Sequence, residues 1–160
     1  MKKRKLIILE YGRHILESEY FAKAGKQTHH IKSDVASHSI NTALFCVLVY
    51  KLFSLLNIKL NLEVLVIAAL AHDIGILGRK EKFSTGHECI TEHPVCSVDA
   101  IKEIEPGTDK RVCDAISSHM YPLGGNKPNS REGWVLTFAD KYAACTDHFR
   151  HYKVCDILSA

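Results

Sequence analysis

The chain has 160 residues, with 21 lysine and arginine residues against 18 aspartate and glutamate residues and a formal net charge of +3. A chain of this length suits one domain and buries enough surface to fold without disulfide bonds. Four basic residues lie together at positions 2–5, so the remainder is close to neutral, which argues against a protein that binds a nucleic-acid polymer.

The cysteines and the apolar runs bear on the cellular compartment. The six cysteines include no Cys-x-x-Cys pair, so neither a zinc ribbon nor a thioredoxin-type motif is supported. The N-terminal apolar segment, residues 6–9, is too short for the core of a signal peptide. The longest other apolar run, residues 44–56, is interrupted by Lys51 and is too short to span a bilayer. We therefore expect a cytoplasmic protein with reduced thiols and no membrane partner.

Residues that favour helices are abundant, and no alternating β-branched run is bounded by Asn-Gly or Asp-Gly. These features predict an all-α fold, a compact single domain over residues 1–160 with about six or seven helices. In the N-terminal half the pattern predicts helices over residues 5–22, 33–57 and 62–77. A polar loop, residues 23–32, separates the first two helices and contains His29 and His30.

The third of these helices ends in an unusual pair of side chains. Its sequence, LEVLVIAALAHDIGIL, carries His72 and Asp73 into its last turn, and Gly75 is suited to the end of a helix. An imidazole and a carboxylate are each costly to bury without a partner, and a metal ion would be a partner for both. Taken alone, the pair equally fits a helix that simply reaches the surface at this point.

The C-terminal half alternates long polar loops with helices. Residues 78–92 are predicted to be a loop, after which His93 and Pro94 open a helix to about residue 105. Further helices are predicted over residues 108–119 and 130–152. Aromatic and apolar residues at helical spacing predict the inward face of the last helix: Trp134, Phe138, Tyr142, Cys145 and Phe149.

Six polar residues lie in, or at the edge of, helices that must bury one face, and so they are candidate metal ligands. They are His38, His72, Asp73, His93, His119 and Asp140. Imidazole and carboxylate ligands without thiolate suit Mn, Fe, Co, Ni or Zn better than Ca. Two such ions about 3.5–4 Å apart can generate a hydroxide and stabilise an in-line displacement at phosphorus.

The pattern of His38, His72-Asp73 and Asp140 resembles the motif of the HD-domain metal-dependent phosphohydrolase superfamily, and HDIG at residues 72–75 is one of its common forms. The order and spacing agree over residues 27–147. The stretches VASHSINTA, EHP, SSHMYPL and TFADKY are similar to small bacterial members of this superfamily. Ile76 and the stretch HMYPLGG differ from the cyclic-dinucleotide branch, so hydrolysis of cyclic di-GMP is not expected.

The resemblance implies that His38, His72, Asp73 and Asp140 hold one divalent metal ion. It implies that His93 and His119 hold a second, with Asp73 as the bridge. Asp73 and His72 would then be the catalytic residues of a phosphohydrolase that acts on a small phosphorylated compound, a nucleotide or a phosphomonoester. Three further residues are candidates for binding this substrate: His30, Arg79 and Lys141.

Two other functions fit the same ligands. Some HD-fold enzymes use four histidines and two aspartates to hold two iron ions, activate oxygen and cleave a carbon bond. A sensor that binds a nucleotide or a metal without turnover is the other alternative. The loops 78–92 and 121–129 are expected to set specificity.

Overall fold

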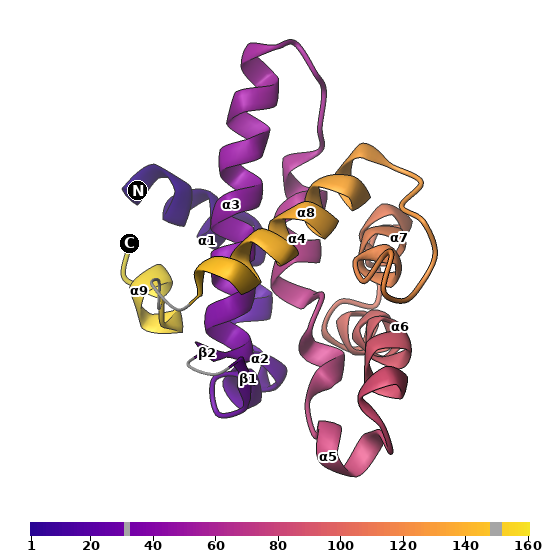
Figure 1. Cartoon of the computed structure of the whole chain (residues 1–160). Coiled ribbons are helices and arrows are strands. Elements are labelled where there is room, and N and C mark those ends of the chain that lie inside the picture. The colour runs from indigo at the N-terminus through magenta and orange to yellow at the C-terminus, as the bar shows by residue number, and fades with distance from the viewer. Residues whose placement is uncertain (31–32, 148–151) are drawn as a thin grey trace.

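The computed structural model describes residues 1–30, 33–147 and 152–160 (Figure 1), and of His30 it describes the backbone alone. Within these ranges the prediction of an all-α fold is confirmed. The helices are α1 (Lys2–Leu16), α2 (Glu19–Ala24), α3 (Val35–Leu55), α4 (Leu62–Ala71), α5 (Arg79–Lys82), α6 (Gly86–Ile104), α7 (Lys110–Ser118), α8 (Arg131–Thr146) and α9 (Val154–Leu158). A 3-10 turn, η1 (Ile74–Ile76), follows α4, and a two-stranded antiparallel pair, β1 (Thr28–His30) and β2 (Ser33–Asp34), precedes α3.

The predicted number of helices, six or seven, was too low for the part of the chain that the structure describes. The short helices α2, α5 and α9 account for the difference. Each has six residues or fewer, a length that gives no clear periodic pattern in a sequence. The first predicted helix is in fact two, because α1 ends at Leu16 and Ser18 caps α2 through its side chain.

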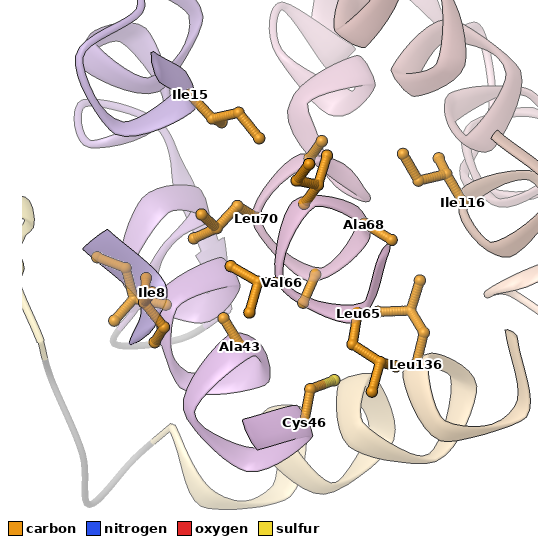
Figure 2. Packing of buried hydrophobic residues seen from close by; sticks show 14 of the residues in the cluster. Ile8, Ile15, Ala43, Cys46, Leu65, Val66, Ala68, Leu70, Ile116 and Leu136 are labelled. Atoms are coloured by element: carbon orange, nitrogen blue, oxygen red, sulfur yellow. The ribbon is translucent and has the colours of Figure 1, made fainter. Parts of the chain in front are cut away.

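Helix α4 is the centre of the core. It packs against α1, α3, α7 and α8, and Figure 2 shows its side chains pointing outward on all sides, toward Ile8, Ala43, Ile116 and Leu136 of these helices. Residues 64–71 are all buried. A helix that is apolar all round is stable only when other elements cover every side of it, so α4 and the residues that follow it are held in a fixed position.

Helix α3 is the longest and runs beside α4 (Figure 1). Asp34 caps it by accepting a hydrogen bond from the backbone N–H of Ser37 at 2.7 Å. By length and composition α3 is also apolar enough to cross a membrane, but half of its most apolar window is buried inside the fold. The core helix of a soluble protein passes the same test, so this finding is weak evidence for a membrane span.

Helix α6 begins earlier than predicted. His93 and Pro94 do not open it; it begins at Gly86, and both residues lie inside the helix. The cap is Thr85, whose hydroxyl accepts a hydrogen bond from the backbone N–H of Glu88, while the Glu88 carboxylate accepts one from the N–H of Ser84. Thr85 and Glu88 therefore form a variant of the capping box. The sequence analysis instead placed the start of the helix at His93 and Pro94, because proline is favoured in the first turn of a helix.

The buried face of α8 also differs from the prediction. Phe138 is 64% exposed and Tyr142 is 41% exposed, and Phe149 lies outside the described residues. The face that packs on α3, α4 and α7 is made instead of smaller residues: Val135, Leu136, Ala139, Asp140 and Ala143. This face allows α8 to approach its neighbours closely, and it turns Asp140 toward the interior.

Candidate metal centre

The six predicted ligands converge from five helical elements. His38 lies in the first turn of α3, His72 is the C-cap of α4, and His119 is the C-cap of α7. Asp73 follows α4 directly, and His93 and Asp140 lie within α6 and α8. All six side chains are buried, with at most 8% of each residue exposed.

Four of these residues form what we call the His38 group: His38, His72, Asp140 and the Oδ2 atom of Asp73. The Nε2 atom of His38 lies 2.9 Å from Oδ1 of Asp140, 3.3 Å from Nε2 of His72 and 3.7 Å from Oδ2 of Asp73. The Nε2 atom of His72 lies 3.6 Å from the same Asp140 oxygen and 3.5 Å from the same Asp73 oxygen.

The remaining two histidines form the His93 group with the other oxygen of Asp73. The Nε2 atoms of His93 and His119 lie 3.1 Å apart. They lie 3.2 Å and 3.4 Å, respectively, from Oδ1 of Asp73. The carboxylate of Asp73 is therefore divided between the two groups, with one oxygen in each.

The Nδ1 atoms of the four histidines show which nitrogen is available to a ligand. Nδ1–H of His72 donates to the carbonyl of Ala69 at 2.9 Å, and Nδ1–H of His119 donates to that of Ile116 at 2.7 Å. Nδ1 of His93 is 2.6 Å from the carbonyl of Cys89, and Nδ1 of His38 is 2.7 Å from Oδ2 of Asp147. Because every Nδ1 faces an acceptor, each Nε2 directs its lone pair into the centre.

The ligand-atom distances in both groups fit a transition-metal ion, and the sets of atoms close enough to share one include His38, His72 and Asp140, and also His72, Asp73 and His119. Metal–ligand bonds of about 2.1 Å place neighbouring ligand atoms about 3.0 Å apart in octahedral geometry and about 3.4 Å apart in tetrahedral geometry. The ligand-atom distances in the two groups run from 2.9 to 3.7 Å. Converging imidazole lone pairs and carboxylates are mutually repulsive unless protons or cations lie between them, so these residues could hold divalent metal ions.

Without an ion, protons take over this role. Burial opposes a charge on His38, but its hydrogen bonds to Asp140 and Asp147 raise its pKa to about 10. Burial likewise favours the neutral form of Asp73, yet the neighbouring His72 and His29 hold the pKa of Asp73 well below its usual range. The pKa of Asp140 is lowered in the same way, against the effect of burial, by hydrogen bonds with His38 and His72.

The two histidines of the His93 group respond in opposite directions. Burial acts against the charge of His93, but its hydrogen bond to Asp73 raises its pKa. Burial lowers the pKa of His119, and the nearby His72 and His93 add to this effect. The pair therefore shares its protons unequally, as expected for two imidazoles that face one carboxylate oxygen.

One residue at the centre was not predicted as a ligand. The Nε2 atom of His29, in strand β1, lies 3.1 Å from Oδ2 of Asp73, and its ring centroid is 4.7 Å from that of His38. His29, His38 and Asp73 together form another set of atoms close enough to hold an ion. The sequence analysis named the neighbouring His30 as a candidate for binding the substrate, and the side chain of His30 lies outside the described residues. The sequence did not show that the ring of His29 would meet Asp73, because this contact depends on how β1 lies against the end of α4.

A second unpredicted residue, Asp147, supports the centre from behind. It is the C-cap of α8 and is 2% exposed. Its Oδ2 atom accepts from His38, and its Oδ1 atom accepts from the side-chain amide of Asn41 at 2.7 Å. Asp147 and Asp140 are seven residues apart, about two helical turns, so both lie on the inward face of α8. That spacing was the signal available in the sequence.

Gly75 joins the two halves of the centre. A Cβ atom at this position would lie 2.3 Å from the backbone nitrogen of Ser97 and 2.4 Å from the carbonyl oxygen of His93. The N–H of Gly75 also donates to the side chain of Ser97 at 2.9 Å. The glycine is therefore required for the close approach between η1 and α6. The sequence analysis expected Gly75 to end a helix, but its backbone does not adopt the positive φ that such a glycine often has.

A cavity of about 550 Å³ opens above the centre. His29, Asp73, His93 and Asp140 line it on the side of the metal ligands. Arg79 and Lys141, two of the predicted substrate-binding residues, line it as well. The ammonium group of Lys141 donates to the carbonyl of His119 at 2.9 Å and to Oδ2 of Asp140 at 3.2 Å, so a positive charge is held beside the carboxylate.

Comparison with known proteins supports one family. A family model described as HD domain matches residues 35–145, which is more than half of the chain. A search of curated proteins and a search of solved structures each returned no match. The matched segment contains all six predicted ligands, whereas His29 and Asp147 lie outside it.

Proposed function

Because the chain belongs to the HD-domain family, we propose that it is a metal-dependent phosphohydrolase that acts on a small phosphorylated compound, a nucleotide or a phosphomonoester. The observation that carries this proposal is the divided carboxylate of Asp73. One oxygen faces His38 and His72, and the other faces His93 and His119. This is the arrangement that a carboxylate needs to bridge two ions.

The residues have distinct roles in this proposal. His38, His72, Asp140 and Oδ2 of Asp73 would hold one divalent ion, and His93, His119 and Oδ1 of Asp73 would hold the other. Two ions so placed would supply Lewis-acid activation of water and of the phosphoryl group. The remaining interactions belong to the chain itself: Lys141 binds phosphoryl oxygens beside Asp140, and Arg79 attracts the anionic substrate at the cavity wall.

Several contacts hold these residues in place before a substrate arrives. The backbone carbonyls of Ala69, Cys89 and Ile116 fix three imidazole rings, and Asp147 fixes the fourth. His29 contacts Oδ2 of Asp73 from the side of the cavity. Such preorganisation lowers the cost of orienting the reacting groups at the moment of reaction.

The test is to assay phosphate release from a panel of phosphomonoesters and nucleotides by protein loaded with Mn²⁺, with metals per chain measured in parallel. We expect phosphate release without oxygen consumption. Substrate-dependent oxygen uptake by the iron-loaded protein would instead establish the oxygenase, and tight nucleotide binding without turnover would establish the sensor; either result overturns the proposal.

Asp73→Ala is the decisive variant, because the bridge between the two groups is lost. We expect it to abolish both turnover and stable binding of either ion. Asp99→Ala is the matched control, since Asp99 is exposed on α6 away from the ligands, and it should keep metal and activity. An Asp73→Ala protein that retained two ions per chain would contradict the bridging role.

A further inference from the structure

We propose that the substrate of this centre is a phosphomonoester whose organic part is mainly apolar, such as an alkyl or aryl group, rather than a nucleotide or a sugar phosphate. This inference rests on the proposed function, because it concerns the compound that enters the same cavity. The cavity of about 550 Å³ lies within the usual range for small-molecule sites, roughly 300–1,000 Å³.

The charged end of the substrate belongs at the inner end of the cavity. Asp73 and Asp140 line that end, and Lys141 places its ammonium group against Asp140 and the carbonyl of His119. A phosphoryl group there would meet the ions that the two carboxylates hold and would also meet Lys141. The ester group must therefore extend outward, along the remaining walls of the cavity.

Those walls are largely apolar. Their apolar part is formed by Ile76 after the HDIG motif, Phe83 before α6, Ile90 on α6, and Met120 and Leu123 after α7, and the cations Arg79 and Lys80 line the cavity beside them. Leu123 is 64% exposed although it lines the cavity. A bound apolar group would bury part of this exposed surface, and removal of apolar surface from water stabilises the complex in proportion to the area buried.

The polar partners that a nucleotide requires are scarce in the described lining. It contains no asparagine or glutamine to read the edge of a base, and its two carboxylates are the metal ligands Asp73 and Asp140. Ser84 and Thr85 contribute the two hydroxyl groups, and the oxygen of Thr85 accepts the N–H of Glu88 as a helix cap. Against the apolar part of the walls, the hydroxyls of a ribose would lose water without replacement, which is unfavourable.

Substrates of increasing apolar size test this inference. Phosphate release by Mn²⁺-loaded protein is measured for straight-chain alkyl phosphates from ethyl to octyl, for phenyl phosphate, and for ribose 5-phosphate and adenosine monophosphate. We expect kcat/KM to rise roughly fourfold with each added methylene until the cavity is filled. A flat series, or a preference for ribose 5-phosphate or adenosine monophosphate, overturns the inference while leaving a phosphohydrolase.

Binding of non-hydrolysable alkylphosphonates, measured by calorimetry, separates the two proposals. If no ester is cleaved but affinity rises with chain length, the phosphohydrolase proposal fails and the apolar character of the ligand stands. Affinity that does not change with chain length overturns the inference, whatever the outcome of the turnover assay.

Two phenylalanine variants test whether the apolar part of the ligand contacts the wall of this cavity. Phe83→Ala removes an aromatic side chain from the cavity wall and should flatten the dependence of phosphonate affinity on chain length. Phe138→Ala removes the same side chain from the outer surface of α8, where it is 64% exposed, and should leave that dependence as it is. An equal effect of both variants would place the apolar contact outside this cavity and overturn the inference.

Discussion

His38 and Asp147 are joined by a hydrogen bond of 2.7 Å between Nδ1 and Oδ2, across 109 residues of sequence. Both residues are buried. The bond connects the first turn of α3 to the end of α8, and it sets which nitrogen of His38 faces the centre. Asp147 therefore positions a candidate metal ligand through the ring nitrogen that faces away from the centre.

The Asp147→Asn variant tests this positioning role. Because the amide is uncharged and can present either an oxygen or a nitrogen to His38, we expect metal affinity to fall roughly 10- to 100-fold. Competition with a chelator measures the affinity. Asp99→Asn is the matched surface control and should bind metal normally. Unchanged affinity in Asp147→Asn would show that the rest of the site fixes the His38 ring.

The Gly75→Ala variant tests the close contact between η1 and α6. The added Cβ would lie within 2.4 Å of two backbone atoms of α6, so the elements must separate. We expect a loss of about 1–3 kcal/mol in the free energy of unfolding together with weaker metal binding, since His93 moves away from Asp73. Urea denaturation and metal analysis measure the two effects.

Gly107→Ala is the control for that variant. Nothing lies within 4 Å of a Cβ at Gly107, and its φ is not positive. The substitution should therefore be neutral or stabilise by about 0.4–1 kcal/mol through the unfolded chain. A Gly75→Ala protein as stable as Gly107→Ala, with full metal content, would contradict the tight contact.

The His29→Ala variant tests the division of the Asp73 carboxylate. The Nε2 atom of His29 contacts Oδ2, the oxygen of the His38 group. We expect the variant to weaken the ion in the His38 group more strongly than the ion in the His93 group. Metal content per chain, measured during stepwise dialysis against a chelator, distinguishes the two ions. His87→Ala, at an exposed position in α6, is the control. Equal loss of both ions would contradict the expectation.

The pH dependence of the metal-free protein follows from the shifted groups. The pKa of His38 rises from 6.5 to about 10 on folding. Its contribution to the free energy of unfolding is therefore complete below about pH 6.5 and is lost as the pH rises through 10. His93 acts in the same direction, while the lowered pKa of His119 opposes part of the effect. Asp73 and Asp140, with lowered pKa values, contribute above about pH 3.8, and their contribution is lost on further acidification.

We therefore expect the metal-free protein to be most stable at mildly acidic pH and to lose on the order of a few kcal/mol toward pH 10. A divalent ion must displace the proton from His38, so the metal-loaded protein should gain stability over the same rise in pH. Thermal denaturation across pH, with and without Mn²⁺, measures both trends. Parallel curves for the two forms would show that His38 carries no proton that the ion displaces.

The six candidate ligands could be picked out from the sequence because each is a costly residue to bury at a place where a helix must be buried, and the structure buries all six and brings them close together. His72 and Asp73 follow eight consecutive buried residues of α4, so few alternative positions exist for them. The end of α7 at His119 was predicted correctly as well, because helix ends carry local signals in the sequence.

The features that the sequence did not reveal depend on contacts between distant segments. Nothing local in the sequence marks His29 as a neighbour of Asp73, and only the position of strand β1 in the fold brings the two together. The role of Gly75 depends on the approach of α6, which lies some twenty residues away along the chain. In α8 the large aromatic residues were taken for the core, but the space between the helices admits alanine rather than Phe138.

The shared carboxylate of Asp73 has a thermodynamic consequence for how the two positions fill. An ion bound to the His38 group would fix the orientation of that carboxylate. The second ion would then bind without a further loss of conformational entropy in the carboxylate, so its affinity would be higher. Such coupling is reciprocal, so an ion in either group strengthens binding in the other by the same factor. If the chain holds two ions, chains that carry a single ion should then be rarer during titration than two independent sites would give.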